Sequence, residues 1–137
     1  MMIKTEGDLS PSKLYRLIDA NLNRLREGIR VLEDIQRFIY DDKKLSRSLK
    51  SLRHQCRVPE YKIYLQTRDI IGDVLKETTS SESKRDTIDS LQLSNIKRAQ
   101  ESARVLEESF KLIDSKEAEK FKHIRYALYD IEKKLLL

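Results

Sequence analysis

Hydrophobic residues recur every three or four positions along most of the chain, a spacing that predicts amphipathic helices. Ser10 followed by Pro11 is a typical helix start, because the hydroxyl caps the first turn and proline suits the first helical position. No helix breaker other than Gly28 follows until residue 40, so we expect a first helix over 11–40, roughly 45 Å long. Its apolar stripe is Leu14, Leu17, Ile18, Leu22, Leu25, Ile29, Leu32, Ile35 and Ile39.

The same periodicity predicts further helices over 43–57 and 60–67, with Cys56 on the inner face of the first of these. Residues 68–84 are rich in Thr and Ser and form the one long loop, and residues 1–9 are a lead-in. Ser83 with Asp86 resembles a capping box, which places the start of a helix that runs to about residue 112. Asp114 caps the last helix, whose stripe is Ala118, Phe121, Ile124, Leu128, Ile131 and Leu135.

One stretch of the first helix occurs twice. Residues 21–39 (NLNRLREGIRVLEDIQRFI) align with residues 95–113 (NIKRAQESARVLEESFKLI) at an offset of 74 positions. A shorter match at an offset of 72 pairs residues 49–53 with 121–125. The identical positions are Asn21/Asn95, Arg24/Arg98, Glu27/Glu101, Arg30/Arg104, Val31/Val105, Leu32/Leu106, Glu33/Glu107 and Ile39/Ile113, and six of these eight pairs are polar or charged.

The repeated unit is therefore a helical hairpin, a long helix followed by a short turn and a shorter helix. We expect an all-α protein of one domain (10–137), built as a helical bundle from halves at 10–57 and 84–137 joined by residues 58–83, with internal pseudo-twofold symmetry. Helices of this length leave apolar surface that one bundle does not cover, so we also expect a homodimer.

Composition narrows the class of protein. The chain has 137 residues with three Gly, two Pro, one Cys and no Trp, which suits a helical domain that needs no disulfides. The net charge of +5 is compatible with anionic ligands, but the charges are interspersed and no nucleic-acid-binding motif is present. The lone Cys56, the absence of an apolar leader and the absence of a membrane-spanning run favour a cytoplasmic protein.

A second face of the long helix mixes charged and apolar residues. We call it the seam face: positions 24, 27, 31, 34 and 38, with 98, 101, 105, 108 and 112 in the second copy. Val31 and Phe38 in its middle predict a semi-buried seam rather than a solvated surface. A ligand site, a structural network of ion pairs and a recent gene duplication each explain why its polar residues repeat.

Arginines with asparagine and carboxylates suit phosphate groups and a divalent cation. No P-loop or dinucleotide-binding glycine motif is present, so phosphate would be held by side chains on helices. The long loop adds Arg68 and Arg85 as phosphate ligands, with Asp69 and Asp73 as metal ligands. The alternative for these four residues is a role in turns and caps.

The repeated motif N-x-x-R-x-x-E-x-x-R-V-L-E resembles a known family over nearly the whole chain from residue 19. The matching strings are DANLNRLREGIRVLEDIQRF (19–38), LKSLRH (49–54), RDIIGD (68–73), SKRDTIDSLQLSNIKRAQESARVLEE (83–108) and FKHIRYALYDIEKKL (121–135). They resemble a small all-helical hydroxymethylpyrimidine-phosphate kinase domain of thiamin biosynthesis, which is often fused in front of thiamin-phosphate synthase.

The resemblance implies ATP-dependent phosphorylation of hydroxymethylpyrimidine phosphate to its diphosphate, with ATP and Mg²⁺ as cofactors. Our hypothesis for the roles has phosphates clamped by arginines, the metal or a base provided by carboxylates, and the pyrimidine edge read by two asparagines. The residues are Arg24, Arg98, Arg30 and Arg104, then Glu27, Glu101, Asp69 and Asp73, then Asn21 and Asn95. The alternative is a non-catalytic helical partner of thiamin-phosphate synthase, and a helical mutase-like enzyme is a third possibility by fold analogy alone.

Overall fold

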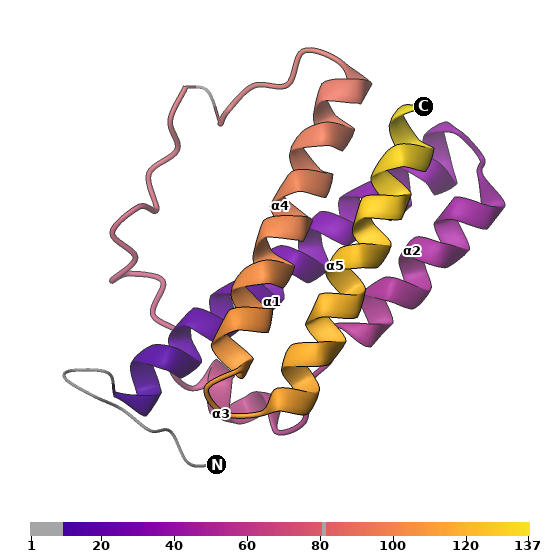
Figure 1. The fold of residues 1–137 in the computed structure, drawn as a ribbon. Helices are drawn as coiled ribbons and strands as arrows, with labels where there is room; N and C mark the ends of the chain where they lie inside the picture. The colour runs from indigo at the N-terminus through magenta and orange to yellow at the C-terminus, as the bar shows by residue number, and fades with distance from the viewer. Residues whose placement is uncertain (1–9, 81) are drawn as a thin grey trace.

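The computed structural model describes residues 10–80 and 82–137, and every regular element in these ranges is helical (Figure 1). This confirms the predicted all-α fold. The elements are α1 (Pro11–Asp34), the π-helix η1 (Ile35–Ile39), α2 (Lys43–Gln55), α3 (Tyr61–Leu65), α4 (Ile88–Phe110) and α5 (Ser115–Leu136). None of the helices in the described part is long and apolar enough to cross a membrane.

Polar caps fix most of the helix starts. The side chain of Ser10 accepts a hydrogen bond from the backbone N–H of Lys13, and Asp114 accepts bonds from the N–H groups of Lys116 and Glu117, both as the sequence predicts. The predicted capping box at Ser83 is wrong. The fourth helix begins at Ile88, because Thr87 is the residue whose side chain caps it, by accepting from the N–H of Ser90 at 3.0 Å.

The core lies where α1 packs on α4 and α2, and α4 packs on α5 (Figure 1). The predicted apolar stripes of α1 and α5 supply most of it, and Phe110 stacks on Phe121 with ring centroids 5.5 Å apart. Gly28 allows α1 and α4 to approach closely, since a Cβ there would lie 3.3 Å from the carbonyl oxygen of Asn95. Two positions of the predicted stripe are exposed instead, Leu17 and Ile39.

The seam face is not buried within one chain, which corrects the prediction of a semi-buried seam. Arg24, Glu27, Arg98 and Glu101 are exposed, and the side chain of Phe38 is 65% exposed. The reason is that α1 and α4 turn their other faces to each other and to α2 and α5, so no helix in the described ranges covers this one. The homodimer therefore stays a prediction, with the seam face as a surface for it.

The long connection between α3 and α4 forms an arc away from the bundle (Figure 1). Every described residue from Arg68 to Asp89 is exposed. Only its first part returns to the bundle, where it runs beside the N-terminal half of α1.

Candidate functional site

A cleft of about 700 Å³ lies between the N-terminal half of α1 and residues 68–76 of the connection. This volume is in the range of sites for small molecules. Five of the residues predicted from the sequence line it: Asn21, Arg24, Arg68, Asp69 and Asp73. The other residues in its wall are Lys13, Arg16, Leu17, Asp19, Ala20, Asn23, Ile70, Gly72, Val74, Leu75 and Lys76.

A buried carboxylate ties the connection to α1. Asp19 is 3% exposed and accepts two hydrogen bonds from Arg68, from Nε at 2.8 Å and Nη2 at 2.9 Å. This hydrogen bond is the main cause that raises the pKa of Arg68 above its ordinary value. Arg16 adds a second link by donating to the backbone carbonyl of Asp69 at 3.2 Å. One wall of the cleft is thus held by charged contacts rather than by apolar packing.

Asp69 and Asp73 each organise a turn in this wall. One carboxylate oxygen of Asp69 accepts from the N–H of Gly72 at 2.8 Å, and one of Asp73 accepts from the N–H of Leu75 at 3.0 Å. Gly72 fits because a Cβ there would lie 2.9 Å from Cγ of Asp69 and would displace the carboxylate. Both aspartates line the cleft while one carboxylate oxygen of each takes part in these turns.

The cleft combines cations with aliphatic side chains. Neither Lys13 nor Arg24 forms an ion pair with any described residue, and Lys76 donates to the backbone carbonyl of Ile71 at 3.2 Å. Leucine, isoleucine and valine side chains of the wall are strongly exposed, with Ile70 at 75% and Val74 at 93%. Such a surface offers positive charge to an anion and apolar area to a ring.

Asn21 lies in the cleft with its amide orientation fixed. Its Nδ2 donates to the backbone carbonyl of Leu17 at 3.0 Å, one helical turn back. Its Oδ1 is therefore the atom that remains to accept a hydrogen bond. Asn95 makes the equivalent bond in α4, to the carbonyl of Leu91 at 2.9 Å.

The remaining predicted residues lie elsewhere. Glu27 and Arg30 line a neighbouring recess of about 260 Å³ with Arg53, on the side of α1 that faces α2. Arg85 donates to backbone carbonyls of its own connection and does not line the cleft with Arg68.

The second copy also lies outside the cleft. Asn95, Arg98, Glu101 and Arg104 on α4 are absent from its wall, and Arg104 pairs with Glu108 at 3.2 Å. The arginines of the two copies, which the sequence hypothesis assigned together to phosphate, therefore do not line one cleft within the described residues.

A metal centre made by the protein alone is not present in the described residues, since no three acidic, histidine or cysteine side chains come together there. Asp69 and Asp73 fit a different arrangement, in which Mg²⁺ takes one or two carboxylates and completes its shell with phosphate and water. Cys56 is no nucleophile here. Its thiol is buried, and burial raises its pKa to about 12.

Asp19 was not predicted from the sequence, and neither were the cations at 13, 16 and 76. Asp19 follows the stripe residue Ile18 directly, and an acidic residue at the edge of an apolar stripe is the signal that could have marked it. The sequence also did not predict two ion pairs. In the structure Glu33 accepts from Arg53, and Glu107 accepts from Arg125.

Comparison with known proteins shows the family of this chain. Residues 16–134 match the model of the ThiD2 family, and this range includes every residue of the cleft wall except Lys13. The chain belongs to the ThiD2 family. No solved structure shows significant similarity to the chain.

Curated relatives of this ThiD2 chain are longer proteins named thiamine-phosphate synthase. The chain is 36% identical to one from Prochlorococcus marinus strain AS9601 over 99% of its own length and 39% of that protein. It is 38% identical to one from Synechocystis, over 93% of the chain and 37% of that protein. It is 40% identical to one from Synechococcus strain CC9605, over 93% and 36%. The chain thus spans less than two fifths of these relatives.

Proposed function

We propose that this protein serves thiamin biosynthesis as a phosphotransferase that converts hydroxymethylpyrimidine phosphate to its diphosphate with ATP and Mg²⁺. Membership of the ThiD2 family and relatives named thiamine-phosphate synthase support the pathway. The observation that carries the chemistry is the cleft of about 700 Å³ beside α1. Its wall holds aspartates, aliphatic side chains, and two cations, Lys13 and Arg24, that have no ion-pair partner among the described residues.

The cleft suits a phosphorylated aminopyrimidine. Aliphatic side chains of residues 70–75 offer a surface for the flat ring, and Lys13 and Arg24 offer charge to its phosphate. Oδ1 of Asn21 is an acceptor for the exocyclic amine, because its amide nitrogen is already bonded to Leu17.

The reaction requires little acid–base catalysis from the protein. The acceptor is a phosphate oxygen that is already largely ionised near neutral pH, so no strong base is required. That oxygen forms a bond to the γ-phosphorus of ATP while the bond to the β-bridging oxygen breaks, which leaves ADP and the diphosphate. Catalysis then consists of positioning and charge neutralisation. Asp69 and Asp73 would hold Mg²⁺, which neutralises phosphate charge, and Glu27 is not needed as a base.

The test is turnover by the purified chain with ATP, Mg²⁺ and the pyrimidine monophosphate, read as diphosphate and ADP by ³¹P NMR. Arg24→Ala should lower kcat/KM about tenfold or more, because a charge-assisted phosphate contact is worth about 1.5–3 kcal/mol. Its free energy of unfolding should change by less than about 0.5 kcal/mol, since the side chain is exposed.

Arg26→Ala is the matched control, because Arg26 lies on the same helix outside the cleft. Equal losses in Arg24→Ala and Arg26→Ala would place the site elsewhere. Arg98→Ala decides whether the second copy takes part, as the sequence hypothesis requires.

A second candidate is a non-catalytic partner of thiamine-phosphate synthase. It is favoured by one finding, that the matched region is part of a longer protein with that name in the relatives. Absence of turnover together with tight, stoichiometric binding to a purified synthase would support this candidate against the kinase.

A further inference from the structure

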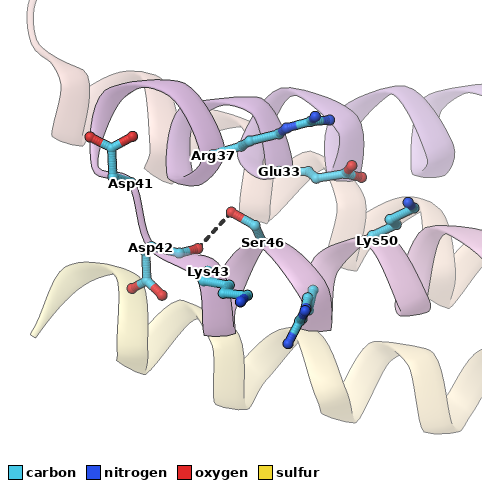
Figure 2. Close-up of a pocket in the computed structure, with 8 residues that line it drawn as sticks. Glu33, Arg37, Asp41, Asp42, Lys43, Ser46 and Lys50 are labelled. Atoms are coloured by element: carbon cyan, nitrogen blue, oxygen red, sulfur yellow. Dashed lines mark hydrogen bonds between the residues drawn. The ribbon is translucent and has the colours of Figure 1, made fainter.

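A second cavity lies at the opposite end of α1 from the cleft. It has a volume of about 420 Å³ and is formed by the end of α1, η1 and the first turns of α2 (Figure 2). Arg37 in its wall is thirteen residues beyond Arg24 of the cleft, which is about 20 Å along a helix. The two sites are therefore separate. The wall of the cavity consists of Glu33, Arg37, Asp41, Asp42, Lys43, Ser46, Arg47 and Lys50.

Two residues at this turn have no counterpart in the second hairpin. The α1/α4 match has an offset of 74 and the α2/α5 match an offset of 72, so Tyr40 and Asp41 are extra. The two extra residues are accommodated by the π-helix η1 and by the left-handed backbone of Asp41, which has a φ of 52°. Both features cost energy in an ordinary chain and are common at functional positions.

Four cations face this cavity without ion-pair partners among the described residues: Arg37, Lys43, Arg47 and Lys50. Arg37 is held over the ring of Phe38 at 4.9 Å. The site does not depend on the N-terminus of α2, which Asp42 already caps by accepting from the N–H of Leu45 at 2.9 Å.

The carboxylates do not cancel this charge. Arg53 neutralises Glu33 by donating from Nε at 2.8 Å, so the four cations face only Asp41 and Asp42 as uncompensated anions. A surplus of two positive charges remains, which a dianionic phosphate group matches.

The second hairpin shows that the fold does not require the cations at positions 43 and 47. At the offset of 72, Lys43 corresponds to Ser115, Ser46 to Ala118 and Arg47 to Glu119. The ion pair beneath the cavity is nevertheless kept, because Arg125 pairs with Glu107 as Arg53 pairs with Glu33. The second hairpin keeps a cation at two of the four positions, with Lys111 for Arg37 and Lys122 for Lys50, so the complete set of four cations is found only in the first hairpin.

We propose that this cavity is a binding site for a dianionic phosphate group, carried by a small metabolite or as inorganic phosphate, and distinct from the cleft. Arg47, Lys43 and Lys50 provide charge from α2, and Arg37 from η1. The volume leaves room for a sugar or ring attached to the phosphate. The second hairpin, with Glu119 in place of Arg47, lacks the site.

The experiment is a ¹H–¹⁵N NMR titration of the full chain with inorganic phosphate at pH 8, against sodium chloride at equal ionic strength. We expect saturable shifts at residues 37–50 and none at 115–122. The variant Lys43→Ser/Arg47→Glu, which copies the second hairpin, should weaken binding at least tenfold and keep the same melting temperature. Unchanged affinity in this variant, equal shifts in both hairpins or the same response to chloride would each overturn the proposal.

Two further arms settle the source of the phosphate and separate this site from the proposed function. Adenosine monophosphate and the pyrimidine monophosphate are titrated in turn, and tighter binding than that of inorganic phosphate identifies a metabolite. Arg24→Ala should weaken pyrimidine phosphate at the cleft and leave the shifts at 37–50 unchanged. Loss of both responses in Arg24→Ala would mean that there is one site, at the cleft.

Discussion

Two ion pairs at equivalent positions of the sequence repeat join the helices of each hairpin. Glu33 meets Arg53 at 2.8 Å between α1 and α2, and Glu107 meets Arg125 at 2.9 Å between α4 and α5. All four side chains are largely buried, and the arginine of the second pair is 10% exposed against 14% for that of the first. Tyr129, by a hydrogen bond, and then Glu107 raise the pKa of Arg125, so this guanidinium stays charged. Each pair thus links the two helices of its hairpin.

Glu107→Ala should lower the free energy of unfolding by about 3–5 kcal/mol, because it leaves Arg125 buried without its partner. Urea denaturation measures the change. Glu108→Ala is the control, since Glu108 is exposed and should cost less than about 1 kcal/mol. Glu107→Ala/Arg125→Met should recover part of the loss, and a double variant as unstable as Glu107→Ala alone would contradict the assignment.

The sequence revealed the members of these pairs but not the pairing. Glu33 and Glu107 are identical in the repeat, and Arg53 and Arg125 match at a different offset. Predicting that these residues pair requires the packing angle between the two helices of each hairpin. The periodicity of the sequence does not give that angle. For the same reason Asp19 could not be matched with Arg68, which lies 49 residues away.

At the scale of elements, residues 68–76 form the wall of the cleft whose dynamics a bound ligand can change. Ile70, Ile71, Val74 and Leu75 are 75–93% exposed, and charged contacts at Asp19 and Asp69 hold the segment. Aliphatic groups in such number at a small-molecule cleft gain free energy when a ring covers them.

Binding of the pyrimidine monophosphate should therefore slow hydrogen exchange of the backbone amides in 68–76. Hydrogen–deuterium exchange with mass spectrometry measures the effect. Residues 82–86 of the same connection lie outside the cleft and should exchange at an unchanged rate. Protection that is absent from 68–76, or that extends equally to 82–86, would contradict a ligand seated against this wall.

Helices were predictable from the sequence wherever an apolar stripe and a cap agree, as at Ser10 and Asp114. The start of α4 was not, because Ser83 and Thr87 both precede acidic residues and both suit a cap, and the structure uses Thr87. The cleft was foreseen in part. Its α1 residues lie on one helix face, but the return of the connection to that face depends on a long-range ion pair.

At the scale of the whole molecule, two buried acids make the fold sensitive to alkali. Burial raises the pKa of Cys56 and that of Tyr64 to about 12, from ordinary values of 9.0 and 10.0. The folded chain therefore keeps protons that the unfolded chain releases, so stability is complete below about pH 9 and falls as the pH rises toward 12.

We expect the free energy of unfolding to decrease steadily between pH 9 and pH 12 in urea titrations at successive pH values. Cys56→Ala/Tyr64→Phe should show a shallower decrease over this range, although its stability at pH 7 is lower because of lost packing. An equal slope in the two proteins would show that other groups cause the alkaline loss.

The two extra residues at the first turn bear on how such a chain can change. Tyr40 and Asp41 are exposed, and the ion pair between Glu33 and Arg53 forms beneath them in the same way as its counterpart without an insertion. Length at this turn is thus uncoupled from the register of the helices that it joins. In evolutionary terms the turn is a place where residues can be gained or lost while both halves keep one common core.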